Sequence, residues 1–278
     1  MQQNYTIKMI ALDLDGTTFN SKGQLSDRTR ATLERAGEQG IYVVISTGRS
    51  YNSLPEFIKN VRGIAYAITS NGAHINDAHT GKAIYDAFLS YAAVEAVKNF
   101  SEANDIGIEV FVNGQAYIDE ATYNDIKENG SPYRNAAYVL WSRKPVPDIK
   151  AVLTDNRDRI ENVNLCFHSA EHLEAHRNEV EAFPEATITS SFKNNLEVGG
   201  PHTSKKTALI ELMKRLNIEQ SELMCCGDAP NDIQMLEYAG LGVAVANAWG
   251  GTLEHADYVT ASNDEDGVAK AIEKFALK

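Results

Sequence analysis

The sequence is poor in features that would mark it as a secreted or membrane protein. It has only three cysteines in 278 residues, and two of them, Cys225 and Cys226, are adjacent. This fits neither a disulfide framework nor the ligand spacing of a zinc site, so we interpret the cysteines as small buried residues in a reducing compartment. No apolar run approaches membrane-spanning length, and the apolar stretch after Lys8 reaches Asp13 too soon for a signal peptide. These absences predict a soluble, cytoplasmic protein.

Positive charge is also scarce. The chain has 26 Lys and Arg against 38 Asp and Glu, which gives a formal net charge of −12. Such a field repels nucleic-acid phosphates and anionic lipid, so we expect neither nucleic acid nor membrane as a partner. A small anionic ligand would need local positive charge.

Strand and helix patterns alternate in the first part of the chain. Residues 9–12 read as a buried strand, residues 26–39 as a helix that Ser26 caps, and residues 41–46 and 65–69 as further strands. The strands are apolar at successive positions, as expected when both faces of a parallel sheet are covered. The pattern predicts a doubly wound α/β fold, whose ligand sites lie beyond the carboxyl ends of the strands.

The α/β pattern returns near the end of the chain. Residues 203–216 form an amphipathic helical pattern, and residues 223–226 and 241–246 read as buried strands. Pro230 is suited to open a helix, which we expect to end at Ala239-Gly240. The first and last parts of the chain therefore belong to one domain, which we place at residues 1–82 and 193–278.

The middle of the chain has a different character. Residues 90–104 read as a helix, and residues 108–119 as a hairpin closed by an Asn-Gly turn. Strands at 162–167 and 186–192 and a helix near 171–182 complete an α+β pattern. Since we expect antiparallel pairing only here, residues 83–192 are predicted to be a second domain inserted into the first.

Polar clusters follow several of the expected strands. They are "DLDGTT" at 13–18, "STGR" at 46–49, "SNGA" at 70–73 and "GDAPND" at 227–232. If the strands are parallel neighbours, all four clusters face one crevice, although the sequence does not establish the strand order.

The residue types in these clusters suit a metal and a phosphate. Asp13, Asp15 and Asp228 supply the hard oxygen ligands that Mg²⁺ prefers, and Asp232 lies one helical turn beyond Asp228. Lys205 would join an ammonium group to the positive end of a helix dipole. Two further donors are Thr47 and the Gly48 amide. A calcium loop of the EF-hand type is excluded because the ligand spacing does not match.

These motifs resemble those of the haloacid dehalogenase (HAD) superfamily, in particular its Cof-type phosphatases with a C2 cap. The matching stretches are "DLDGTT", "STGR", "TSKKTAL" and "GDAPNDIQML", which occur in the family's order with a large insertion between the second and third. The resemblance implies a Rossmann-like core and a Mg²⁺-dependent phosphatase of small phosphorylated metabolites. It also implies that the insertion is a cap that governs substrate specificity.

The resemblance implies a role for each matching residue. Asp13 would attack phosphorus to form an aspartyl-phosphate, and Asp15 would act as general acid and then as general base. The expected phosphate ligands, which include the catalytic Lys205, are Leu14 (through its backbone amide), Thr47, Gly48, Lys205 and Asn231. The expected metal set is Asp13, Asp15 through its backbone carbonyl, Asp228 and, standing behind it, Asp232.

Some points stay open at this level. The family pattern usually has Gly where this chain has Lys206, although Lys205 aligns with the motif. Sugar phosphates are the first expected substrates, and phosphorylated cofactors such as FMN or pyridoxal phosphate the second. The alternatives are a phosphomutase of the same superfamily and, less consistent with the length, a non-enzymatic phospho-aspartate switch.

Overall fold

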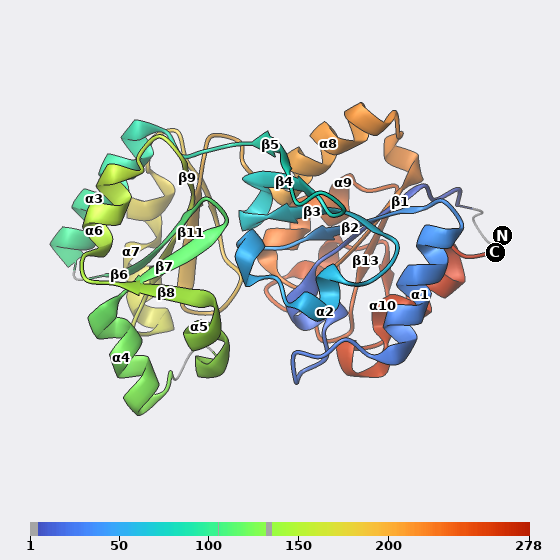
Figure 1. The fold of residues 1–278 in the computed structure, drawn as a ribbon, viewed down its shortest axis with the longest axis horizontal. Helices are drawn as coiled ribbons and strands as arrows, with labels where there is room; N and C mark the ends of the chain where they lie inside the picture. Colours follow the sequence, from blue (N-terminus) through green and yellow to red (C-terminus); the bar gives the residue numbers. More distant parts are fainter. Residues whose placement is uncertain (1–4, 105, 132–134) are drawn as a thin grey trace. The chain divides into compact units, whose positions relative to one another are not determined.

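The computed structural model describes residues 5–104, 106–131 and 135–278. The chain divides into two compact units. The first comprises the residues up to Gly48 together with Leu54–Tyr85 and Ser204–Lys278, and the second comprises Arg49–Ser53 and Asp86–Thr203. Each unit contains its own sheet (Figure 1).

The sheet of the first unit has eight strands in the order β14-β13-β12-β1-β2-β3-β4-β5. The strands are β1 (Met9–Leu12), β2 (Tyr42–Ser46), β3 (Ile64–Thr69), β4 (His74–Asp77), β5 (Ala83–Asp86), β12 (Leu223–Gly227), β13 (Leu241–Ala244) and β14 (Tyr258–Val259). All pairings from β14 to β3 are parallel. The carboxyl ends of β12, β1, β2 and β3 therefore lie next to one another at one edge of the sheet, which supplies the strand order that the sequence left open.

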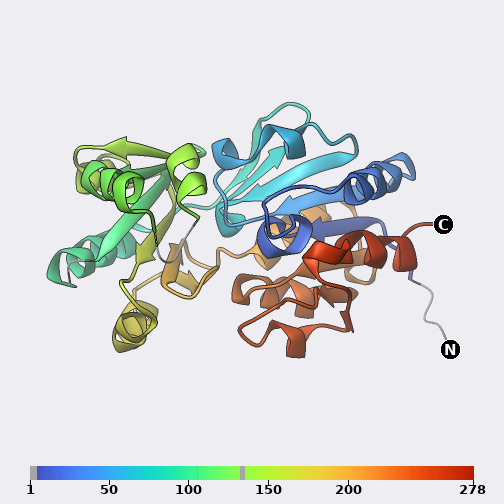
Figure 2. The same cartoon turned by 90° about the horizontal axis from the view of Figure 1, so that it is seen from below.

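Helices cover both faces of this sheet, as the apolar strands require. They are α1 (Asp27–Glu38), α2 (Glu56–Lys59), α8 (Lys205–Leu216), α9 (Ile233–Tyr238) and α10 (Gly267–Phe275). Met9 and Ala11 pack with apolar residues of α8 and α9, whereas Ile10 and Leu12, which point the opposite way, are also fully buried. Figure 2 shows α1 and α10 side by side, and α1 packs on β2 and β3.

Local sequence signals set the ends of these elements. The Ser26 side chain accepts a hydrogen bond from the Thr29 amide at 3.0 Å, so it caps α1 as expected. The Ser204 side chain caps α8 in the same way through the Thr207 amide at 3.1 Å. The second cap fixes the position of Lys205, the first residue of α8.

One expectation about the main sheet is wrong. Antiparallel pairing is not confined to the middle of the chain, because β4 pairs antiparallel with β3, with Thr69 opposite His74. Only the helical turn Ser70–Gly72 and Ala73 separate the two strands, and such a short connection forces the chain to reverse. The doubly wound α/β fold predicted from the sequence is confirmed, with this hairpin added at its edge.

The second unit contains a six-stranded sheet in the order β10-β11-β9-β6-β7-β8. The strands are β6 (Gly107–Val112), β7 (Gln115–Asp119), β8 (Arg143–Val146), β9 (Ile160–Cys166), β10 (Thr187–Thr189) and β11 (Asn195–Gly199). Strands β6 and β7 form the expected antiparallel hairpin. Asn113 and Gly114 both have positive φ, at 51° and 73°, as a tight Asn-Gly hairpin turn requires.

The helices of the second unit are α3 (Tyr91–Asn104), α4 (Glu120–Asn129), α5 (Ala136–Ser142), α6 (Ile149–Asp155) and α7 (Ala170–Glu181). Residues of α3, α6 and α7 form one apolar core with one face of β6, β9 and β11. A smaller cluster joins Ile118 to Ile126 of α4 and Val139 of α5. Unlike the first unit, this unit is α+β, and the domain limits expected from the sequence stay a prediction.

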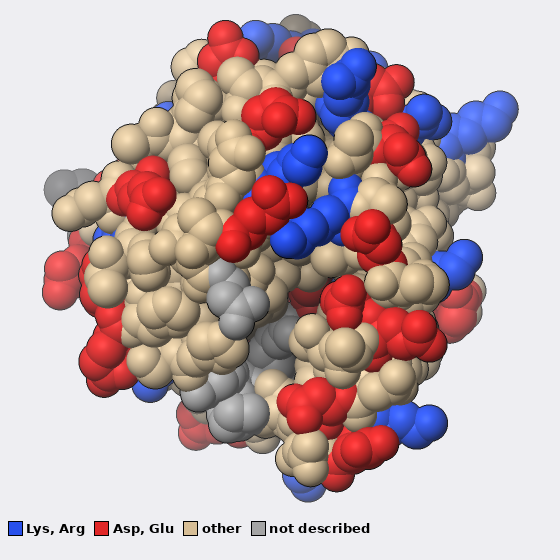
Figure 3. Space-filling view, turned by 90° about the vertical axis from the view of Figure 1, so that its left-hand side faces the viewer, with Lys and Arg blue, Asp and Glu red and all other residues tan. Residues whose placement is uncertain are grey.

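Charged side chains of both signs cover the face of the molecule that Figure 3 shows. On the face shown in Figure 3, basic side chains gather in the upper middle and have acidic neighbours, while acidic side chains are spread widely around them. Within the described ranges, every helix is too short or too polar to cross a bilayer.

Candidate active site

The site begins where β1 ends. The Asp13 amide donates to the Cys226 carbonyl oxygen at 3.0 Å, so Asp13 extends the pairing of β1 with β12 by one residue. Behind it, the Thr18 hydroxyl donates to the Asp13 carbonyl oxygen and closes the loop that follows the strand. This arrangement holds Asp13 at the carboxyl edge of the sheet, between the ends of its two neighbours.

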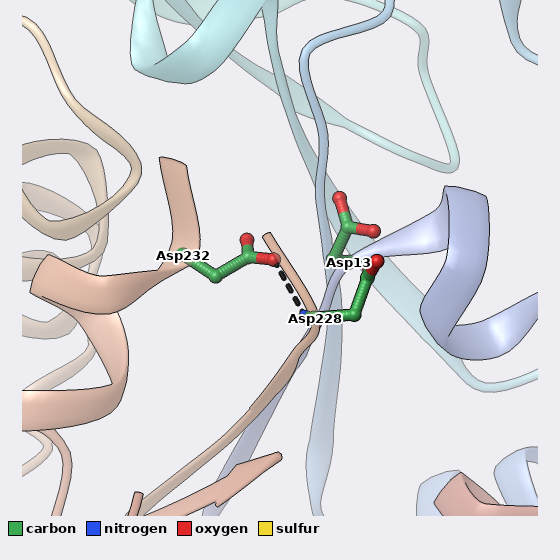
Figure 4. A group of neighbouring side chains, drawn as sticks. All are labelled: Asp13, Asp228 and Asp232. Atoms are coloured by element: carbon green, nitrogen blue, oxygen red, sulfur yellow. Dashed lines mark hydrogen bonds between the residues drawn. The ribbon is translucent and has the colours of Figure 1, made fainter. Parts of the chain in front are cut away.

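Three aspartates from two strand ends converge at this edge (Figure 4). Oxygen atoms of Asp13, Asp228 and Asp232 lie within 4.8 Å of one another, and all three residues are buried. Asp228 directly follows β12, and Asp232 lies in the helical turn Pro230–Asp232 after it. Buried carboxylates at this spacing repel one another unless a proton or a cation is shared among them.

Lys205 supplies one cation. Its Nζ atom lies 2.6 Å from Oδ1 of Asp13 and 2.6 Å from Oδ1 of Asp232, and its side chain is only 1% exposed. The first turn of α8 thus places an ammonium group between two of the three carboxylates. The neighbouring Lys206 points elsewhere, with its Nζ 5.6 Å from the ring centre of Tyr238.

The negative charge that Lys205 does not neutralise, together with burial, shifts the pKa values of the site. Burial raises the pKa of Asp13 well above its usual value, against the opposing effect of Lys205, and Asp232 and Asp228 raise it further. Burial likewise raises the pKa of Asp228 to about 7, with a further contribution from Asp232. For Lys205, burial lowers the pKa, but Asp13 and Asp232 outweigh it and hold the pKa above its usual range. Without a further cation, Asp13 and Asp228 therefore retain protons to higher pH than an exposed aspartate does.

Asp232 has hydrogen-bond donors on both oxygen atoms. Oδ1 accepts from Lys205, and Oδ2 accepts from the backbone amides of Asp228 at 2.9 Å and Ala229 at 3.1 Å. The Asp228 bond is the dashed line in Figure 4. Asp232 therefore holds the ammonium group of Lys205 and the backbone of the Asp228 loop in place together.

Gly16 allows the first loop to approach Asp228. Its φ is +82°, in the left-handed region, and a Cβ atom there would lie 2.5 Å from Oδ2 of Asp228. The close approach lets the Thr17 hydroxyl donate to Oδ1 of Asp228 at 2.6 Å. An L-residue at position 16 would be strained and would displace the carboxylate.

The other expected residues occupy different surroundings. Leu14 is fully buried, whereas Asp15 is exposed beside it and is not part of the carboxylate cluster. Thr47 follows β2 and is buried, and its amide donates to the Ile68 carbonyl oxygen at 2.9 Å. Gly48 follows it in the chain.

Asn231 lies in the turn between Asp228 and Asp232. Its Nδ2 donates to Oδ1 of Asn71 at 3.1 Å.

Of the residues expected from the sequence, the structure brings four into direct contact or close proximity: Asp13, Asp228, Asp232 and Lys205.

Two residues at the site escaped the sequence reasoning. Thr17, which orients Asp228, stands inside the "DLDGTT" motif but has no distinctive spacing of its own. Asn247 donates from Nδ2 to the Gly16 carbonyl oxygen at 2.8 Å and so ties the first loop to the segment after β13. Its position in "ANA", directly after the expected strand 241–246, was the only available signal.

Comparison with known proteins identifies the family. The model of the haloacid dehalogenase-like hydrolases matches residues 10–272. The chain belongs to this family. The match spans both units and includes every residue of the candidate site.

The relatives agree with this assignment. In Bacillus subtilis, the 5-amino-6-(5-phospho-D-ribitylamino)uracil phosphatase YcsE is 30% identical, over 99% of this chain and 98% of its own. The phosphatase YwpJ of the same organism is 32% identical, over 95% of this chain and 98% of its own. A solved haloacid dehalogenase-like hydrolase from B. subtilis superposes with a TM-score of 0.82 at 30% identity, covering 96% of this chain and 99% of that one. The chain is thus a phosphatase of the HAD type that acts on small phosphorylated substrates.

Substitution of Gly16 tests the close approach to Asp228. We expect Gly16→Ala to lower kcat/KM by about a hundredfold, because an ångström of displacement at a reacting centre can cost that much. Gly23→Ala is the matched control, since Gly23 also has positive φ, at +71°, but a Cβ atom at that position would meet nothing within 4 Å. Both variants should lose about 1–2 kcal/mol of stability from backbone strain. Equal activity of the two variants would contradict the role of the contact.

The raised pKa of Asp228 predicts a pH-dependent stability. Because the folded state holds this proton up to about pH 7 whereas an exposed aspartate releases it near 3.8, the group's contribution to metal-free stability is lost as pH rises between these values. If the cluster binds Mg²⁺, the ion would take the place of this proton, so Mg²⁺ should raise Tm more at pH 8 than at pH 5.5. Asp228→Asn should raise the metal-free Tm at pH 8 and remove most of the Mg²⁺ effect. Thermal unfolding in EDTA and in Mg²⁺ checks this, and an unchanged Mg²⁺ effect in the variant would count against Asp228 as a ligand.

Proposed function

We propose that this phosphatase works through a phosphorylated Asp13, with Mg²⁺ bound by Asp13 and Asp228 of the carboxylate cluster. The observation that carries the proposal is the pairing of the buried Asp13 with Lys205 beside a second carboxylate, Asp228. Lys205 Nζ donates to Oδ1 of Asp13, and its positive charge opposes the rise in the Asp13 pKa that burial causes. A bound Mg²⁺ would favour the ionised, nucleophilic carboxylate further.

The reaction would proceed in two displacements. In the first, a carboxylate oxygen of Asp13 forms a bond to phosphorus while the bond from phosphorus to the substrate's alcohol oxygen breaks, and Asp15 gives its proton to that oxygen. In the second, Asp15 takes a proton from water as the water oxygen attacks phosphorus, and the bond between phosphorus and Asp13 breaks. The products are the alcohol and inorganic phosphate, and Asp13 and Asp15 return to their initial states.

The surroundings of Asp15 support its separate role. Asp15 is exposed, outside the buried cluster, so its side chain is accessible to water and to a leaving alcohol. Asp13 is buried and held by Lys205, which suits a nucleophile that must stay in one orientation. The two neighbouring carboxyl groups thus occupy environments that favour different tasks.

The donor set fits Mg²⁺. Asp13, Asp228 and the backbone carbonyl of Asp15 would hold the ion, whose charge would offset that of the carboxylates and the phosphoryl group. Since N–H donors occupy both oxygen atoms of Asp232, we assign to Asp232 the positioning of Lys205 and of the Asp228 loop.

The phosphoryl oxygens would be bound by donors from several loops. Lys205 is already placed beside Asp13, and the Leu14 amide, Thr47, Gly48 and Asn231 are the other proposed donors. For the organic part of the substrate, we propose sugar phosphates first and phosphorylated cofactors second. A relative that matches nearly the whole chain is named for a phosphorylated ribityl compound, which is consistent with a polyol-bearing substrate.

Loss of the proposed nucleophile should nearly abolish turnover. We expect Asp13→Asn to lower kcat by at least about a thousandfold, because the amide cannot form the covalent intermediate. Phosphate release from a panel of sugar and cofactor phosphates, with and without Mg²⁺, measures this. The control is Asp158→Asn, which changes an exposed carboxylate of the second unit and should leave turnover unchanged. Product analysis distinguishes a hydrolase, which releases phosphate, from a mutase, which gives an isomeric sugar phosphate.

The role of Asp15 predicts a dependence on the leaving group. In Asp15→Asn, alkyl phosphates should lose far more activity than aryl phosphates, because only a poor leaving group needs a proton in the first displacement. Comparison of single-turnover rates for a sugar phosphate and p-nitrophenyl phosphate isolates that step. Equal losses for both substrates would argue against Asp15 as the general acid.

A further inference from the structure

The turn after β3 has an unusual backbone. Ser70 and Asn71 both have positive φ, at 50° and 55°, although neither is glycine. Left-handed conformations are unfavourable for residues with a Cβ atom, and asparagine tolerates them better than most. The surrounding contacts must therefore hold this turn, which is the polar cluster "SNGA" of residues 70–73.

Three loops of the active site hold the turn. The Asn71 amide donates to the Thr47 carbonyl oxygen at 3.1 Å. Asn71 also accepts, through Oδ1, a hydrogen bond from Nδ2 of Asn231 at 3.1 Å. At Gly72, a Cβ atom would overlap the carbonyl oxygen of Ser204, so the turn packs directly against the residue before Lys205. Asn71 is thus tied to the loops that carry Thr47, Asn231 and Lys205.

The Asn71 side chain keeps an unused donor. The residue is only 4% exposed, and among the described residues its Nδ2 has no hydrogen-bond partner. The same holds for Oδ1 of Asn231. The two side-chain amides therefore share one hydrogen bond, while Nδ2 of Asn71 remains available as a donor and Oδ1 of Asn231 as an acceptor. A buried amide without a partner costs free energy, and such groups in a functional site commonly await a ligand.

We propose that Asn71 binds the phosphoryl group of the substrate, with Nδ2 donating to a phosphoryl oxygen beside Asn231. The inference rests on the function proposed above and adds to its phosphate ligands a residue from a fourth strand end. A neutral donor suits this place because the Lys205 ammonium is already shared between Asp13 and Asp232. A further amide adds attraction for the anion without adding another charge that needs a counterion.

Two substitutions separate the donor from the backbone. Asn71→Gly removes the amide and relieves the left-handed strain, so the variant should fold with unchanged or higher Tm. Asn71→Asp keeps the size and the acceptor for Asn231 but replaces the NH₂ group by an oxygen. The matched control is Asn217→Gly, because Asn217 also has positive φ, at 53°, as the C-cap of α8.

The measurement is the binding of inorganic phosphate in the presence of Mg²⁺ by calorimetry, together with kcat/KM for a sugar phosphate. We expect Asn71→Gly to weaken phosphate binding about tenfold, the range for a hydrogen bond to a charged group. Asn71→Asp should weaken it more, since a carboxylate would face the anion. Asn217→Gly should bind phosphate like the wild type.

Unchanged phosphate affinity in both Asn71 variants would overturn the inference, even if their activity fell together with Tm, because that pattern indicates a structural turn only. Failure of the proposed function would look different. In that case the wild type itself would release no phosphate from any substrate of the panel, whereas its affinity for phosphate could still be compared with that of the variants.

Discussion

The site depends on one buried ion pair network, in which the Lys205 ammonium lies between Asp13 and Asp232. An uncompensated charge buried in a protein is costly, and the Lys205 ammonium offsets part of the negative charge of these two carboxyl groups. The network also joins distant parts of the chain, since Asp13 follows β1, Lys205 begins α8 and Asp232 lies in the turn after β12. The two ion pairs of Lys205 therefore both shape the site and hold these three segments of the fold together.

The network leaves an excess of negative charge. Three buried carboxylates face one ammonium group, so two negative charges remain to be neutralised when all three are ionised. Together with burial, this excess of negative charge raises the pKa values of Asp13 and Asp228, so these groups keep their protons to higher pH. A divalent cation matches it in charge and, with oxygen ligands only, in ligand type. Both oxygens of Asp232 accept hydrogen bonds from N–H donors, which is why we propose that it positions the cluster and does not bind the cation.

Patterns in the sequence predicted the elements that position the site, because their signals are local. The apolar strand of residues 9–12, the Ser26 cap and the Asn113-Gly114 hairpin all appear in the structure. The antiparallel strand β4 was missed, since "HIND" is short and polar at both ends, and its place follows from the turn before it. Thr17 and Asn71 could not be singled out for a related reason: where a short polar side chain points depends on loop dihedral angles that residue type alone does not fix.

The same loops explain why small residues matter here as much as charged ones. Gly16 lets the first loop approach Asp228, and Gly72 lets the turn after β3 approach Ser204, and in both places a Cβ atom would overlap its neighbour. The loop that carries Asp228 is therefore in close contact with the loop of Gly16, and the start of α8, which carries Lys205, is in close contact with the turn of Gly72. Electrostatic stabilisation of a phosphoryl group requires donors and charges that are already in place before the reaction starts. In this chain, close packing of the loop backbones restricts the positions of the side chains they carry. The donors and charges of the site are therefore held in place before a substrate binds.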